Sequence, residues 1–314
     1  MALLNKNNIP YFKLHISVFI FGFTAILGKL ISVNHFSLVW NRMWIALPIF
    51  FLIPGFLAKL RKQNLRQWLI YLGIGCLVAL HWITFYGSIK IGNSASLTLA
   101  CLGLSACFTS VLEPLFTRTK FKTTELFLGL VALAGMLFIF FSNQNDDPAQ
   151  NQRFYLAILW GIITTLLASI FSVLNAKFAK QDQPNVMSFT ELLGGFLFLT
   201  VCFFVMNKFT AIKNLLQIDH TTLTISNSLD WIWLILLGVF CTTFAFVLNV
   251  TAMKSVSAFT ANIAIGLEPV YGILLAFLIF GEGTQFNTNF YIGISLILTT
   301  IIIQTYFNLK KKRL

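Results

Sequence analysis

Four charged side chains lie inside long apolar runs of the 314-residue sequence, and they are the residues best placed for chemistry. They are Arg42, Glu113, Glu191 and Glu268. A charge at the centre of a bilayer costs about 2.5–3.5 kcal/mol on insertion scales, so such a residue is a functional candidate by default. Their different depths predict different roles.

Glu268 lies deepest, near the middle of the apolar run 256–280, and Pro269 follows it. Proline removes a backbone hydrogen bond, so a helix can open there and leave carbonyl groups facing a cavity. We therefore expect Glu268 and Pro269 to form a proton site or a site for a substrate amine, with Glu268 as the group that titrates. The structural alternative is a neutral carboxyl group that is hydrogen-bonded to a neighbouring helix.

The other three charges are expected nearer the ends of their runs. Glu113 lies close to Arg118 and Lys120, which predicts an interfacial salt bridge. Arg42 and Glu191 are expected near opposite faces of the membrane, where each gates its own side of a cavity or acts as a structural anchor. We do not expect these two residues to pair directly.

Three further candidates for a substrate or proton site, His81, Trp82 and Tyr86, lie midway along the run 67–89. An imidazole at that depth could relay protons or bind substrate, and it could equally be a neutral histidine bonded to a backbone carbonyl. The small residues of 94–96 predict close helix packing rather than ligand binding.

The elements that position these residues are membrane helices. The composition is 57% hydrophobic and 10% charged, whereas soluble domains average about 45–50% apolar and about 25% charged residues. This excludes a soluble enzyme, a nucleic-acid-binding domain and a disordered chain. Continuous apolar runs of about 20 residues predict an all-α membrane protein rather than a barrel. The ten predicted spans are 11–33, 36–57, 67–89, 93–116, 124–142, 153–175, 186–206, 230–252, 256–280 and 289–307.

The distribution of Lys and Arg predicts the orientation. With the N-terminus inside, 16 of the 22 basic residues fall on the inner side and 5 on the outer side, and Arg42 lies within a span. The positive-inside rule then places both termini in the cytoplasm of a multi-pass protein of the cell (inner) membrane.

An internal repeat is indicated by short matches that keep the same order in both halves. Residues 25–29 resemble 173–177, Arg42 matches Glu191, and 73–76 resemble 238–241. Five spans per half is an odd number, so the halves enter the membrane in opposite directions. Inverted repeats around a midplane site are the plan of many secondary transporters.

The chain also resembles the drug/metabolite transporter superfamily of the EamA type. The resemblance rests on Ser-Ile-Lys-Ile-Gly-Asn-Ser-Ala-Ser (88–96), Ala-Met-Lys-Ser-Val-Ser-Ala (252–258), Gly-Leu-Glu-Pro-Val (266–270) and Phe-Gly-Glu (280–282). It implies two EamA-like five-helix units, at 14–142 and 155–306, with a central cavity between them. It also implies transport, often outward, of amino acids, other small metabolites or drugs.

No cofactor or metal site is expected. The five cysteines lie in apolar runs without the spacing of a zinc site. Gly22 to Lys29 imitates a P-loop, but the glycine spacing is wrong and Leu30 replaces the magnesium-binding Ser or Thr. The expected partners are the lipid bilayer, a small-molecule substrate and protons as the candidate coupling ion, but not nucleic acid. The chain is expected to be a monomer or a homodimer.

We therefore expect a secondary transporter, working as an exporter, that uses alternating access rather than catalysis. One alternative is a membrane-embedded enzyme acting on a lipid-linked substrate. It would need clustered acidic or metal-binding groups, and Asp146-Asp147 is the one adjacent acidic pair. The other alternative is a membrane sensor, which would not need an inverted repeat.

Overall fold

The computed structural model describes residues 9–118, 120–142, 147–178, 183–208, 223–245, 247–248 and 266–311, and its regular structure over these ranges is entirely helical. The elements are α1 (Ile9–Leu30), α2 (His35–Ala46), η1 (Leu47–Leu52), α3 (Phe56–Leu60), α4 (Leu65–Gly92), α5 (Ala95–Leu102), α6 (Ser105–Thr117), α7 (Thr123–Phe140), α8 (Pro148–Phe178), α9 (Pro184–Lys208), α11 (Ser228–Ile235), η2 (Leu236–Phe244), α14 (Glu268–Phe280), η3 (Glu282–Gln285) and α15 (Thr288–Lys311).

Six stretches of helix within the described residues are long and apolar enough to cross a membrane, so the chain is a multi-pass membrane protein. They are Ile9–Leu30, Leu65–Gly92, Ala95–Phe116, Thr123–Phe140, Pro148–Asn175 and Asn185–Met206. Shorter apolar helices are Ser228–Phe244, Glu268–Phe280 and Thr288–Ile303. The first part of the predicted span 256–280 and the motif at 252–258 lie outside the described residues.

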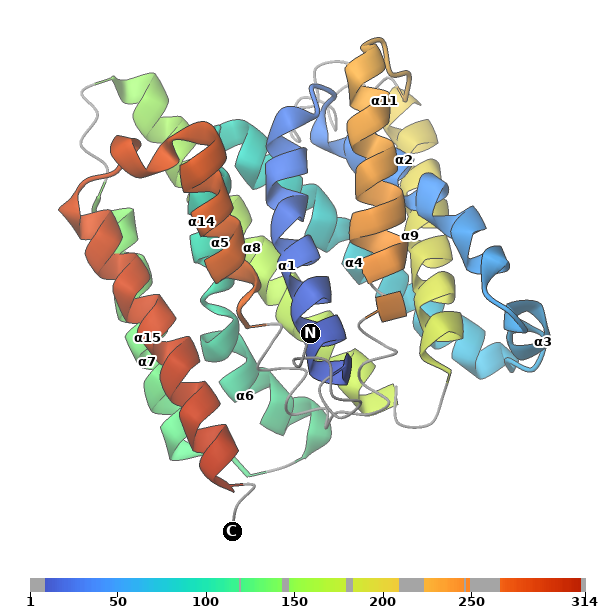
Figure 1. The fold of residues 1–314 in the computed structure, drawn as a ribbon, viewed down its shortest axis with the longest axis horizontal. Helices are drawn as coiled ribbons and strands as arrows, with labels where there is room; N and C mark the ends of the chain where they lie inside the picture. The colour runs from blue at the N-terminus through green and yellow to red at the C-terminus, as the bar shows by residue number, and fades with distance from the viewer. Residues whose placement is uncertain are drawn as a thin grey trace.

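The helices form one bundle in which α4 packs along both α8 and α9 (Figure 1). The pair α7 and α15 forms one edge of the bundle, and α9, α2 and α3 lie toward the other. Helix α1 crosses the front of the view and packs against α14. In this view α1 begins and α15 ends in the lower half of the picture.

Glycines allow α4 and α9 to approach closely. A Cβ atom on Gly194 would lie 2.6 Å from Leu72 Cα, and one on Gly195 would lie 2.8 Å from Gly75 O. Small residues are typical of contacts between membrane helices, where backbones must come close to gain packing energy. This contact holds the α9 backbone, including Glu191, against α4.

The predicted span 36–57 is not one continuous α-helix. Helix α2 ends at Ala46 and continues as the 3₁₀ helix η1, with Pro48 in its first turn. Proline has no backbone N–H to donate to an α-helical hydrogen bond, which explains why the α-helix changes to a 3₁₀ helix at this point. Gly55, with φ of 72°, then turns the chain into α3.

One of the predicted spans contains a break. The run 93–116 is divided into α5 and α6 by a turn at Gly103 and Leu104. Helix α14 begins after a turn at Gly266 and Leu267, and residues 256–265 of its predicted span lie outside the described residues. Discontinuous helices at such positions are common where transporters bind their substrates.

Candidate functional site

Arg42 on α2 is buried, with 3% of its surface exposed, and its guanidinium is held from two sides. Its Nε donates to Thr242 Oγ1 at 2.7 Å, and its Nη1 donates to the Tyr86 hydroxyl at 2.6 Å. Its Cζ lies 3.8 Å from the centre of the Trp82 ring, in a cation–π contact. We call Arg42, Trp82, Tyr86 and Thr242 the Arg42 site.

Trp82 and Tyr86 reach this site because they are four residues apart on α4 and therefore share one face of the helix. Tyr86 is fully buried. Both residues were expected to contribute to a substrate site, whereas Arg42 was expected to act nearer the membrane surface as a gate or anchor. The structure brings all three together.

Sequence reasoning missed Thr242. It lies in η2, where the backbone forms a π-helix. Its hydroxyl donates to Leu237 O at 2.8 Å while accepting from Arg42. π-Helical turns occur frequently at functional sites, but neither hydrophobic periodicity nor motif spacing reveals them.

Glu268 is the first residue of α14 and is half-buried. It lies near enough to Arg42 and Tyr86 for their charges to interact. We expected Pro269 to open the middle of a helix, and this expectation is wrong. Pro269 lies in the first turn of α14, where no intrahelical hydrogen bond is lost, and the turn at Gly266 and Leu267 comes before it.

His81 points to a different neighbour. Its Nδ1 lies 2.9 Å from Thr164 O, and the Thr164 hydroxyl donates to His81 O at 2.7 Å. The ring also packs against Phe85 and Phe171. These reciprocal bonds link α4 to α8. The arrangement is that of the structural alternative for His81, a histidine bonded to a backbone carbonyl.

Glu191 and Glu113 lie apart from the Arg42 site. Glu191 on α9 accepts one hydrogen bond, from Asn175 Nδ2 on α8 at 3.3 Å. Glu113 is exposed near the end of α6. It lies within electrostatic range of Lys122, which forms an ion pair with Glu125 at 2.6 Å.

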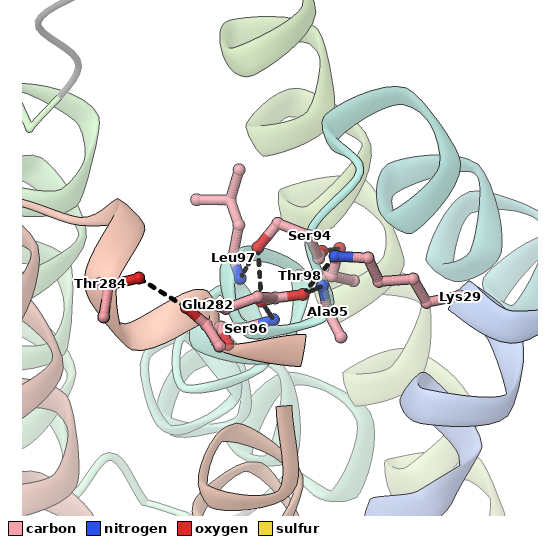
Figure 2. A network of polar contacts seen from close by, with 9 residues as sticks. Lys29, Ser94, Ala95, Ser96, Leu97, Thr98, Glu282 and Thr284 are labelled. Carbon is pink, nitrogen blue, oxygen red and sulfur yellow. Dashed lines mark hydrogen bonds and ion pairs between the residues drawn. The ribbon is translucent and has the colours of Figure 1, made fainter. Parts of the chain in front are cut away.

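A polar network surrounds Glu282, in the loop between α14 and α15, and we call it the Glu282 network (Figure 2). Glu282 is completely buried. Lys29 Nζ at the end of α1 lies 2.8 Å from its Oε1. The start of α5 supplies the other donors, which are the Ser94 hydroxyl at 2.9 Å, Ala95 N at 3.0 Å and Ser96 N at 2.8 Å.

This environment keeps Glu282 charged. Burial alone would raise the pKa of the Glu282 carboxyl, but hydrogen bonds from Lys29, Ser96 and Ala95 outweigh it and hold the pKa below its usual value. The N-terminus of α5 adds a favourable dipole. The small residues of 94–96, which we expected only to pack closely, therefore bind a carboxylate.

A second polar contact closes the same end of the bundle. The backbone N–H of Ser32 donates to Asp230 Oδ1 at 2.8 Å, and the Ser32 hydroxyl donates to Oδ2. Lys90 donates to Ile31 O beside them. The loop after α1 is thereby tied to α11 and to the end of α4.

The described residues also form an open hollow of about 330 Å³ along α15. Its lining residues are Thr288, Tyr291, Ile292, Ser295, Leu296 and Thr299. None of them belongs to the Arg42 site, and the hollow brings together no charged group. The Arg42 site is therefore the better candidate for substrate chemistry.

Comparison with known proteins gives the family. The sequence model of the EamA-like transporter family matches residues 8–141 and 156–306. An uncharacterised transporter of Clostridium kluyveri is 25% identical over 219 residues, which is 69% of this chain and 66%, just under two thirds, of that protein. An uncharacterised transporter of Synechocystis is 23% identical over 278 residues, covering 87% of this chain and 76% of that protein.

A solved structure titled only "Crystal structure of protein" has the same fold, with a TM-score of 0.63 at 14% identity over 95% of this chain and 96% of that one. The family model and the two transporter relatives confirm the resemblance to drug/metabolite transporters inferred from sequence motifs. The family matches together span most of the residues between 8 and 306. The chain belongs to the EamA-like transporter family.

Proposed function

We propose that the protein is a secondary transporter that exports small zwitterionic metabolites such as amino acids. The observation that supports it is the Arg42 site, where a buried cation meets two aromatic rings from α4 and a hydroxyl group from η2, together with Glu268 on α14, which lies within electrostatic range of Arg42. Groups of opposite charge at one buried position suit a substrate that carries both charges.

The chemistry of such a substrate assigns a role to each residue. Its carboxylate binds the guanidinium of Arg42, which offers a planar set of donors suited to carboxylates. Its ammonium binds Glu268, and its side chain packs on Trp82. Tyr86 and Thr242 orient Arg42 in the absence of substrate, because both already accept its hydrogen bonds.

The proposed architecture has ten spans in two inverted five-helix units, at 14–142 and 155–306, with both termini in the cytoplasm of the inner membrane. Two observations support it. The family model matches the chain twice. The breaks before α6 and before α14 also fall at nearly corresponding positions of the two units, at Leu104 and Leu267. In this arrangement Arg42 and Glu268 belong to different units, so relative movement of the units changes the site.

The Glu282 network and the contact between Ser32 and Asp230 lie at the outer end in this orientation. Both join the first unit to the second. They close the outer end of the path, and alternating access requires them to separate when substrate leaves.

The test is exchange transport by the purified protein in lipid vesicles, using a mixture of labelled amino acids as the probe. Arg42→Lys keeps the charge but loses the planar donor set, so we expect exchange to fall tenfold or more, in line with the loss of about 1.5–3 kcal/mol for a hydrogen bond to a charged group. Glu125→Gln on the surface of α7 is the matched control and should transport normally.

Two outcomes would contradict the proposal. One is that wild-type protein exchanges no amino acid. The other is that Arg42→Lys, with a thermal stability equal to wild type, transports at the wild-type rate.

A further inference from the structure

Glu191 is a buried acid whose surroundings offer almost nothing to a negative charge. Only 6% of its surface is exposed. Its Oε2 accepts one hydrogen bond from Asn175 Nδ2 at 3.3 Å, which is longer than the usual 2.7–3.2 Å for such a bond. An ionised carboxylate held by one neutral donor in this position costs several kcal/mol.

Among the side chains that the structure describes, none forms an ion pair with Glu191. The elements that contact α9 carry, among other titratable or charged residues, Tyr71 and Cys76 on α4, Arg42 on α2 and Lys59 on α3. Arg42 donates to Tyr86 and Thr242, Cys76 donates to Leu72 O, and Lys59 is exposed. None of the four forms a described contact with the Glu191 carboxyl group.

Two acceptor oxygens at this place, Glu191 Oε1 and Asn175 Oδ1, are buried and have no hydrogen-bond partner in the described part of the chain. One oxygen belongs to the Glu191 carboxyl group and the other to the Asn175 amide group. The hydrogen bond from Asn175 Nδ2 already joins these two groups. Two acceptors cannot satisfy each other, because neither carries a hydrogen. Adding one proton to the carboxyl group provides the missing donor, since an acid O–H can then donate to the amide oxygen.

A proton fits this pair better than a metal cation does. One carboxyl and one amide group provide too few oxygens for a hard cation, which takes six or more. A single proton satisfies both unpaired oxygens and also removes the buried charge. We propose that Glu191 and Asn175 form a proton-binding site, which couples the transport proposed above to the proton gradient.

The position of the site gives it access to one side of the membrane. Thr190, the preceding residue, donates to Gln63 Oε1 at 3.1 Å, and Gln63 lies in the loop between α3 and α4. That loop also carries Arg61 and Lys62, and the positive-inside rule assigns such basic loops to the cytoplasm. Protons therefore exchange with the cytoplasmic side. Glu268 is then free to bind substrate rather than serve as the coupling acid.

Infrared difference spectroscopy of the full-length protein in lipid nanodiscs, recorded without substrate as pH is varied, tests the site directly. A buried acid that takes up a proton gives a carboxyl C=O band. We expect this band in wild type and in Glu268→Gln, a matched control at a half-buried acid, and we expect its loss in Glu191→Gln. Asn175→Leu should keep the band but raise its frequency, because the C=O group loses its hydrogen bond from Nδ2.

The proposal is overturned if the band persists in Glu191→Gln or disappears only in Glu268→Gln. If Glu191→Gln fails to fold, Glu191→Asp and Asn175→Leu must still change the band, and an unchanged band in both variants also overturns the proposal.

Vesicle assays separate this proposal from the transport function. Glu191→Gln should lose accumulation driven by a pH gradient and keep amino-acid exchange. Absence of exchange in wild type would contradict the transport function while leaving the infrared result for Glu191 intact.

Discussion

Glu282 and Glu191 are both buried acids, yet their surroundings are opposite. Glu282 receives a lysine, a hydroxyl group and two backbone N–H groups. Glu191 receives one amide N–H. Burial alone therefore does not determine what an acid does in this protein. The number of donors around it decides whether it is suited to hold its charge permanently, as at Glu282, or to bind a proton, as we propose for Glu191.

Removing the Glu282 charge should have the largest effect on stability. Glu282→Gln leaves the half-buried Lys29 without its counter-ion and provides an amide N–H₂ where the start of α5 needs an acceptor. Breaking a buried pair in this way costs about 3–5 kcal/mol. Thermal unfolding in detergent should show a large decrease of the melting temperature.

A double variant serves as the control for that experiment. Lys29→Met combined with Glu282→Gln should recover part of the loss, because the uncompensated charge is removed as well. If Glu282→Gln alone melts at the wild-type temperature, Glu282 is no better supported than Glu191, and the comparison between them fails.

Acid should weaken the Glu282 network to a smaller extent. The pKa of Glu282 is lower in the folded protein than the usual value of 4.5, so its contribution to stability is fully present above about pH 4.5 and is lost as the pH falls through the folded pKa. The effect is smaller than that of the substitution, because a protonated carboxyl group keeps an acceptor oxygen. Melting temperatures measured between pH 7 and pH 3 should decrease more steeply for wild type than for Glu282→Gln, and parallel curves would contradict this assignment.

Neutralising Glu191 should change stability least. Glu191→Gln preserves the shape of the side chain and supplies an N–H for the unpaired Asn175 oxygen, so we expect a change within about 1 kcal/mol, in either direction. Thermal unfolding at pH 7 measures it. A loss as large as that of Glu282→Gln would mean that Glu191 holds a structural charge.

The sequence predicted several features that depend on local apolar length. The predicted spans 67–89 and 124–142 correspond to α4 and α7, because apolar runs of this kind form helices independently of the rest of the chain. The grouping of Trp82 with Tyr86 followed from helical periodicity. Neither the count of ten spans nor the repeat follows from such local signals, and both remain predictions.

Features that depend on distant contacts were missed. Glu282 was not a candidate because it lies in a loop, and its partners are 253 and 188 positions away in sequence. Thr242 depends on a π-helix that apolar patterning does not encode. The break beside Pro269 was expected, but at the wrong place, because proline is equally suited to the first turn of a helix.

The Glu282 network also has a consequence for how the protein is made. Lys29 leaves the ribosome well before Glu282, which is synthesised 253 positions later. Until then, Lys29 and the N–H groups at the start of α5 have no carboxylate to bind. The loop between α14 and α15 therefore completes a contact that α1 requires, so a nascent chain ending before Glu282 leaves these donors without their carboxylate. Assembly of this end of the bundle is complete only after Glu282 has been translated.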